Sequence, residues 1–126
     1  MMIGTVNANR EAIVQIAILG DSQKYQSVKA VVDTGFTGCL ILPTMMISTL
    51  GLICYAQQEG ILGDGSIHLF NVYEGVVIWD GAVRTIEVND SDATPLIGMG
   101  LLEGYELRIE AIAGGTGDII TTRCNL

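Results

Sequence analysis

The chain has 126 residues, a formal charge of -8 at pH 7 and a mean hydropathy of +0.47. This length suits one domain, spanning residues 1–126. Its basic residues are scattered along the chain, which argues against nucleic acid and anionic membranes as partners. The high apolar content has two explanations: a large core, or an apolar surface that a second copy covers.

The first half of the chain predicts short strands joined by turns. The expected strands cover residues 3–6, 12–19, 27–32, 40–42 and 52–56. Pro43 stands where a helix begins, and Gly51 stands where a helix end requires positive φ. We therefore expect a helix of about two turns from Thr44 to Leu50.

The second half predicts two hairpins and further strands. Asp64-Gly65, between apolar residues, is a strong short-range signal for a hairpin, and Asp80-Gly81 predicts a second hairpin turn. The expected strands cover the second hairpin arm up to Tyr73 and then residues 75–79, 83–88, 96–97, 105–111 and 119–122, with a helical turn at residues 99–102. Short strands at such regular spacing predict an all-β sandwich or barrel and not βαβ units.

Cysteine and histidine usage does not predict a metal centre. The three cysteines are Cys39, Cys54 and Cys124, widely spaced, and His68 is the only histidine. Zinc ligands stand closer together in sequence. The acidic loop at Asp90 and Asp92 has too few ligands for calcium and is predicted to be solvated. We therefore expect no metal and no cofactor.

The same cysteines predict reduced thiols and a cytoplasmic protein. The N-terminus lacks the basic region of a signal peptide. Residues 34–58 carry no charge, but Pro43 and Gly51 interrupt them, so a buried strand and a short helix fit better than a membrane span.

The stretch Asp33-Thr34-Gly35 is the main candidate for chemistry. The apolar strand Ala30-Val31-Val32 leads directly into it. Such a tripeptide alone is most simply an Asx-turn that ends a strand. Its context strengthens the functional interpretation, because the second apolar-apolar-glycine element Leu96-Ile97-Gly98 follows further along, with the glycine-rich hairpin between them.

In these elements and their order the sequence resembles the retropepsin-like aspartic proteases, particularly their small single-lobe prokaryotic members. The matching residues are Val31-Val32-Asp33-Thr34-Gly35, Leu40-Ile41-Leu42-Pro43, Gly63-Asp64-Gly65-Ser66 and Leu96-Ile97-Gly98-Met99. The resemblance covers nearly the whole chain. It implies a closed retropepsin-like barrel with one or two short helices, assembled as a homodimer through terminal strands at residues 3–6 and 119–122.

The resemblance also implies roles for individual residues. Asp33 would be catalytic, with Thr34 and Gly35 supporting its loop. Gly63, Asp64 and Gly65 would tip the substrate-binding flap, and Leu96, Ile97 and Gly98 would pack beside the active site. Since one chain supplies one Asp-Thr-Gly, the second carboxylate would be Asp33 of another copy.

The function implied is that of an aspartic endopeptidase acting on an extended peptide or protein substrate, with water activated by paired Asp33 carboxylates. The chain departs from the family pattern at Phe36, where a small Ala or Ser is most common. The alternative is therefore a non-catalytic dimeric module, peptide-binding or structural, on the same fold.

Overall fold

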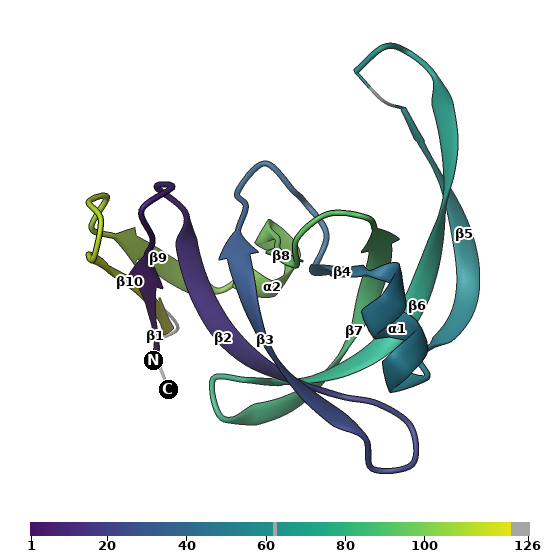
Figure 1. Cartoon of the computed structure of the whole chain (residues 1–126), viewed down its shortest axis with the longest axis horizontal. Coiled ribbons are helices and arrows are strands. Elements are labelled where there is room, and N and C mark those ends of the chain that lie inside the picture. The colour runs from purple at the N-terminus through teal and green to yellow at the C-terminus, as the bar shows by residue number, and fades with distance from the viewer. Residues whose placement is uncertain (62, 122–126) are drawn as a thin grey trace.

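The computed structural model describes residues 1–61 and 63–121, in which ten strands belong to one sheet (Figure 1). The all-β class predicted from the sequence is confirmed. The strands are β1 (Met2–Val6), β2 (Ala12–Leu19), β3 (Tyr25–Val32), β4 (Leu40–Pro43), β5 (Ile53–Ile61), β6 (Ile67–Trp79), β7 (Ala82–Ser91), β8 (Leu96–Ile97), β9 (Tyr105–Ile109) and β10 (Thr116–Thr121). The helices are α1 (Thr44–Leu50) and α2 (Met99–Leu102).

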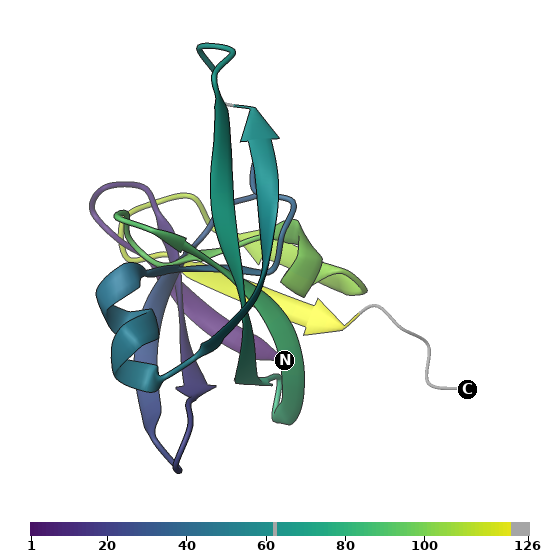
Figure 2. The same ribbon diagram turned by 90° about the vertical axis from the view of Figure 1, so that its right-hand side faces the viewer.

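Part of this sheet closes into a barrel. The order β6-β7-β4-β8-β3-β2 returns to its start because β6 also pairs with β2, with Ile18 opposite Val77. On one side the order continues through β1, β10 and β9. On the other side β5 and the first part of β6 form a long hairpin that rises above the barrel (Figure 2). The predicted closed barrel is confirmed.

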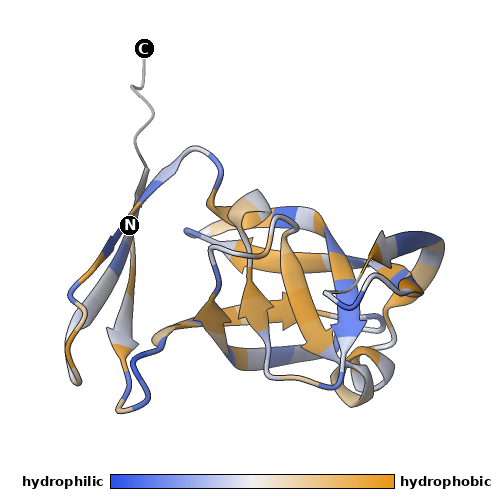
Figure 3. Ribbon diagram, turned by 90° about the horizontal axis from the view of Figure 1, so that it is seen from above, coloured by the Kyte–Doolittle hydropathy of each residue, from blue (hydrophilic) through white to orange (hydrophobic). Residues whose placement is uncertain are grey.

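The barrel is filled by the inward residues of its strands. Along β2, Val14, Ile16 and Ile18 are buried, whereas Gln15 between them is exposed. In the other barrel strands the same two-residue alternation points apolar side chains into the barrel. Figure 3 colours much of the ribbon of these strands as hydrophobic. Trp79 is fully buried and meets Tyr105 edge to face, with ring centroids 6.0 Å apart. This contact attaches β9 to the barrel.

Helix α1 has the bounds that its flanking residues predict. Pro43 precedes it with φ -58°, and Gly51 ends it in the left-handed conformation with φ 71°. The Gly51 N–H donates to the carbonyl oxygens of Ile47 and Ser48 at 3.0 and 3.1 Å. Ile47 and Leu50 are buried against the barrel, so local signals and packing agree.

Strand β6 differs from the prediction, because it is one strand of 13 residues and not two. The sequence suggested a break before Gly75. In the structure Gly75 lies inside the strand, where a Cβ would come within 2.7 Å of Val88 Cγ2. Glycine here permits close packing and not a turn. β5 likewise continues through its polar residues to Ile61, since pairing with β6 extends that far.

The two hairpin turns differ from each other. The hairpin turn predicted at Asp80-Gly81 is confirmed as a two-residue turn, because Trp79 pairs with Ala82 and both turn residues have positive φ, 51° and 78°. The hairpin predicted at Asp64-Gly65 is present as β5 and β6, and its loop is longer than two residues, because the last paired residues are Ile61 and Ile67. The longer loop is held by Asp64.

Within this loop the Asp64 carboxylate accepts two hydrogen bonds from Ser66. The Ser66 N–H donates to Asp64 Oδ1 at 2.9 Å, and the Ser66 hydroxyl donates to the same oxygen. These bonds favour the ionised carboxylate and lower the pKa of Asp64, although the group is exposed. The ionised form therefore supports the loop above the ordinary pKa of a carboxyl, and this support is lost as the pH falls through the lowered pKa.

We predict that Ser66→Ala raises the pKa of Asp64 towards its ordinary value, because the larger of the two stabilising hydrogen bonds disappears. Carboxyl-carbon NMR during a pH titration would measure this pKa. Ser48→Ala, at an exposed position of α1, is the control and leaves the pKa of Asp64 unchanged. If Asp64 had the same pKa in the wild type and in both variants, the hydrogen bond from the Ser66 hydroxyl to Asp64 would be contradicted.

Candidate active site

The end of β3 and the short strand β8 bring two distant sequence elements together. β8 lies between β3 and β4, parallel to the first and antiparallel to the second (Figure 1). Asp33 follows directly after β3, and its N–H donates to the carbonyl oxygen of Ile97 at 2.8 Å. The structure thus places Leu96-Ile97-Gly98 beside the Asp33 loop.

Local hydrogen bonds orient the Asp33 carboxylate. The Gly35 N–H donates to Asp33 Oδ1 at 2.9 Å, and the Phe36 N–H donates to the Asp33 carbonyl oxygen at 3.1 Å. A Cβ at Gly35 would lie 3.2 Å from Asp33 Oδ1, which is a tight approach. The half-buried Asp33 side chain is thus held in an Asx-turn whose glycine leaves room for the carboxylate.

Thr34, the residue after Asp33, has no partner for its side chain among the described residues. It is exposed, and its hydroxyl forms no hydrogen bond with any other residue in 1–61 or 63–121. A hydroxyl at this place is available to a group outside the chain. The single chain therefore accounts for the position of Asp33 and of Gly35, but it gives Thr34 no role.

Phe36 is packed into a crowded junction between residues 33–39 and residues 98–100. Its carbonyl oxygen accepts a hydrogen bond from the Met99 N–H at 2.8 Å. The Gly98 N–H donates to Cys39 O at 3.0 Å, and the Gly100 N–H donates to Gly38 O at 2.9 Å. A Cβ at Gly98 would overlap both the Gly38 carbonyl oxygen and the Phe36 ring. Only glycine fits at this position.

A groove of about 540 Å³ lies between the hairpin and the barrel. Phe36 and Ile41 line it from the barrel, and Phe70 lines it from the hairpin. Its other lining residues are polar or small: Gln58, Glu59, Gly60, Asn89, Asp90, Ser91 and Asp92. The loop that carries Asp33 therefore contributes Phe36 to the same groove as the hairpin, although Asp33 itself does not line it.

Sequence reasoning missed the part that the end of β7 plays in this groove. Asp90 and Asp92 were expected in a solvated loop, yet both line the groove. β7 pairs with β4 in parallel, with Asp90 opposite Leu42, and this pairing brings the acidic end of β7 to the groove. No local signal could have indicated this, because the pairing joins segments far apart in sequence.

The predicted flap residues lie at the far end of the hairpin. Gly63 and Gly65 have open space where a Cβ would be, and Gly65 has φ 83°. Glycine at position 65 therefore serves the conformation of the loop, and neither glycine makes a close contact within the described chain. Gly60, further down, does make such a contact, because a Cβ there would overlap the Phe70 ring.

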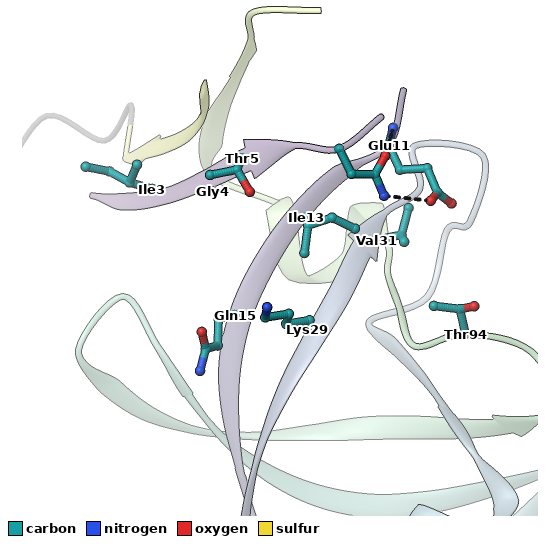
Figure 4. A pocket seen from close by; sticks show the side chains of 10 residues that line it. Ile3, Gly4, Thr5, Glu11, Ile13, Gln15, Lys29, Val31 and Thr94 are labelled. Atoms are coloured by element: carbon teal, nitrogen blue, oxygen red, sulfur yellow. Dashed lines mark hydrogen bonds between the residues drawn. The ribbon is translucent and has the colours of Figure 1, made fainter. Parts of the chain in front are cut away.

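A second hollow, of about 580 Å³, lies on the outside of β1, β2 and β3 (Figure 4). Ile13, Lys29 and Val31 contribute to it, and the Asn7 amide donates to Glu11 Oε1 at 2.9 Å along its edge. The hollow reaches Val31, two residues before Asp33. The outside of β3 is therefore accessible near the candidate carboxylate.

Other chemistries find little support near this site. Burial raises the pKa of the Cys39 thiol, which keeps it protonated at neutral pH and unsuited to nucleophilic attack. Among residues 1–61 and 63–121 no three His, Cys, Asp or Glu side chains gather into a possible metal site. No helix in this part of the chain is long and apolar enough to cross a membrane.

Comparisons with known proteins agree with this arrangement of strands. No protein-family model and no curated protein matches the chain. One solved structure, that of a retropepsin-like aspartic protease from Rickettsia conorii, is similar with a TM-score of 0.59 and 17% sequence identity. The likeness covers 95% of this chain and 91% of that chain. The resemblance in fold predicted from the sequence is confirmed, and the chain has a retropepsin-like fold.

Proposed function

We propose that the protein is a homodimeric aspartic endopeptidase whose catalytic residue is Asp33. The observation that carries this proposal is the place of Asp33 in a retropepsin-like fold: it follows β3, bonds to Ile97 of β8 and has its carboxylate oriented by Gly35. We propose further that residues 1–126 act as one domain in the cytoplasm. The free thiols of Cys39 and Cys54 support that location.

The chemistry requires two Asp33 carboxylates, one from each copy. Two carboxylates about 3 Å apart cannot both be ionised, so they share one proton. The ionised member takes a proton from a water molecule, which then attacks the peptide carbonyl carbon. The protonated member stabilises the developing oxyanion and subsequently protonates the leaving amine. In this arrangement the exposed Thr34 hydroxyl would face the partner loop.

The substrate in this proposal is an extended peptide segment lying in the groove beneath the hairpin. Backbone hydrogen bonds to an added strand give affinity independent of sequence, and side-chain pockets give selectivity. Phe36 and Ile41 on the barrel side and Phe70 on the hairpin side offer apolar surface, and Asp90 and Asp92 add carboxylates to the lining. The flap residues Gly63, Asp64 and Gly65 would cover the bound peptide.

The second candidate is a non-catalytic dimeric module that binds peptides or serves a structural role. Phe36 favours this candidate, because the resemblance implies a small residue after Asp33-Thr34-Gly35, where a serine hydroxyl could hydrogen-bond the carboxylate. The groove would then remain, but Asp33 would not be needed for its function. Substitution of Asp33 therefore separates the two candidates.

We predict that Asp33→Asn lowers peptide cleavage by about 10²-fold or more, since the pair can no longer act as acid and base. Mass spectrometry of a peptide library incubated between about pH 4 and pH 7 would measure cleavage. Asp21→Asn, at an exposed surface turn, is the matched control and retains activity. Cleavage that survives Asp33→Asn would contradict the catalytic role, and a groove that binds peptides without cleaving them would favour the binding module.

We also predict that Phe36→Ala changes which peptides are cleaved, because removing the ring widens the groove. The favoured cleavage sites should shift towards bulkier side chains in the same library. The free energy of unfolding should fall by about 2 kcal/mol, less than for a fully buried phenylalanine, as the half-buried ring leaves the junction with Gly98. Tyr25→Ala, which removes an exposed aromatic ring, should alter neither property. An unchanged cleavage profile would mean that Phe36 does not contact the substrate.

A further inference from the structure

Strand β9 lies at one end of the sheet and leaves one of its edges open. The terminal strands β1 and β10, which the family resemblance implied would build a dimer, pair with each other in the same chain. β10 also pairs with β9, and no strand among the described residues covers the other edge of β9. An open edge of this kind is a template for pairing with another chain.

The open edge is held in place before any partner arrives. Tyr105 packs edge to face on the buried Trp79, and Leu107 packs against the barrel core. Glu106 and Arg108 point to the other face, where they are exposed. Because the strand is already ordered, pairing with it costs less conformational entropy than pairing with a flexible segment.

The backbone groups of β9 alternate between its two edges. The Glu110 N–H donates to Thr116 O at 2.8 Å, so Glu110 turns its N–H towards β10. In an antiparallel ladder the residues of the same parity, Glu106 and Arg108, do likewise. Tyr105, Leu107 and Ile109 therefore present their N–H and C=O groups on the open edge.

We propose that β9 pairs antiparallel with β9 of a second copy, with Leu107 opposite the partner's Leu107. A two-fold axis through such a pair stands perpendicular to the sheet and keeps each side chain on its own face. A residue can then face only a partner residue of the same parity. Within β9 this leaves registers centred on Glu106, Leu107 or Arg108.

Charge distinguishes these registers. In the register centred on Leu107, Glu106 lies opposite the partner's Arg108, and Arg108 lies opposite the partner's Glu106. Opposite charges therefore pair twice. Centred on Glu106, two glutamates face each other. Centred on Arg108, two arginines face each other and Glu106 faces the partner's Glu110. Like charges directly opposite destabilise a sheet.

Backbone pairing favours the same register. In the register centred on Leu107, every residue that presents its backbone groups on the open edge has a partner. Tyr105 faces the partner's Ile109, and Leu107 faces the partner's Leu107. The other two registers leave Ile109 or Tyr105 without a partner from β9. The sequence Tyr105-Glu106-Leu107-Arg108-Ile109 is therefore self-complementary in both charge and apolar character.

Within one chain Arg108 Nη2 already lies 3.0 Å from Glu106 Oε1. Both side chains are at least half exposed, so this ion pair contributes little alone. In the paired sheet the two copies would form an alternating group of four charges. The alternative is that Glu106 and Arg108 prevent another strand from pairing with β9, as charged residues on edge strands often do. This alternative predicts a monomer.

Sedimentation velocity over a concentration series tests the register through charge reversal. Glu106→Arg or Arg108→Glu alone creates like-charge pairs and should weaken self-association about tenfold or more. The double variant Glu106→Arg/Arg108→Glu restores opposite charges and should associate like the wild type. A mixture of the two single variants should form a heterodimer, which also shows that each is folded. Lys24→Glu, which changes the net charge equally at a distant turn, should have no comparable effect.

A wild-type protein that stays monomeric, or a dimer insensitive to these substitutions, would overturn the pairing of β9. The inference deepens the proposed function, which requires two copies, but the two can fail separately. Asp33→Asn should lower cleavage by about 10²-fold or more and keep the dimer. Charge-dependent association without cleavage would refute the protease alone, and Asp33-dependent cleavage by a dimer insensitive to charge reversal at β9 would refute the β9 interface alone.

Discussion

The passage of β8 between β3 and β4 is the constraint on which the rest of the structure depends. This strand has two residues, yet it pairs on both edges and ends in a junction without spare space. The carbonyl oxygen of Gly38 and the ring of Phe36 occupy the place of any side chain at Gly98. Because Ile97 also accepts the Asp33 N–H, the position of the candidate carboxylate depends on this close packing.

Features set by short-range geometry could be predicted from the sequence. Pro43 and Gly51 bound α1 because φ is restricted at both, and Asp80-Gly81 gives its two-residue turn for the same reason. The turn at Asp33 belongs to this class too, since its hydrogen bond to Gly35 spans two residues. Such features need no knowledge of the distant chain.

The features that sequence reasoning missed depend on pairing or packing between separate segments, which local sequence patterns do not show. The length of β6 follows from its pairing with β5 and β7. Gly75, considered with its sequence neighbours alone, suggested that one strand ended and another began there. Asp90 reaches the groove only because β7 pairs with β4. Phe36 illustrates which part of the candidate site could be predicted. The sequence alone shows that a large residue follows Asp33-Thr34-Gly35, but it does not show that this ring packs on Gly98.

Strand β6 has one further consequence, because its partners change along its length. From Val72 to Trp79 it pairs with β7, and residues 76–78 also pair with β2. From Ile67 to Asn71 it has only β5 beside it. A two-stranded ribbon is much less resistant to bending than a closed barrel wall. One strand therefore has a rigid part in the barrel, residues 72–79, and a more flexible part in the hairpin, residues 67–71. The hairpin can bend over the groove while the barrel keeps its shape.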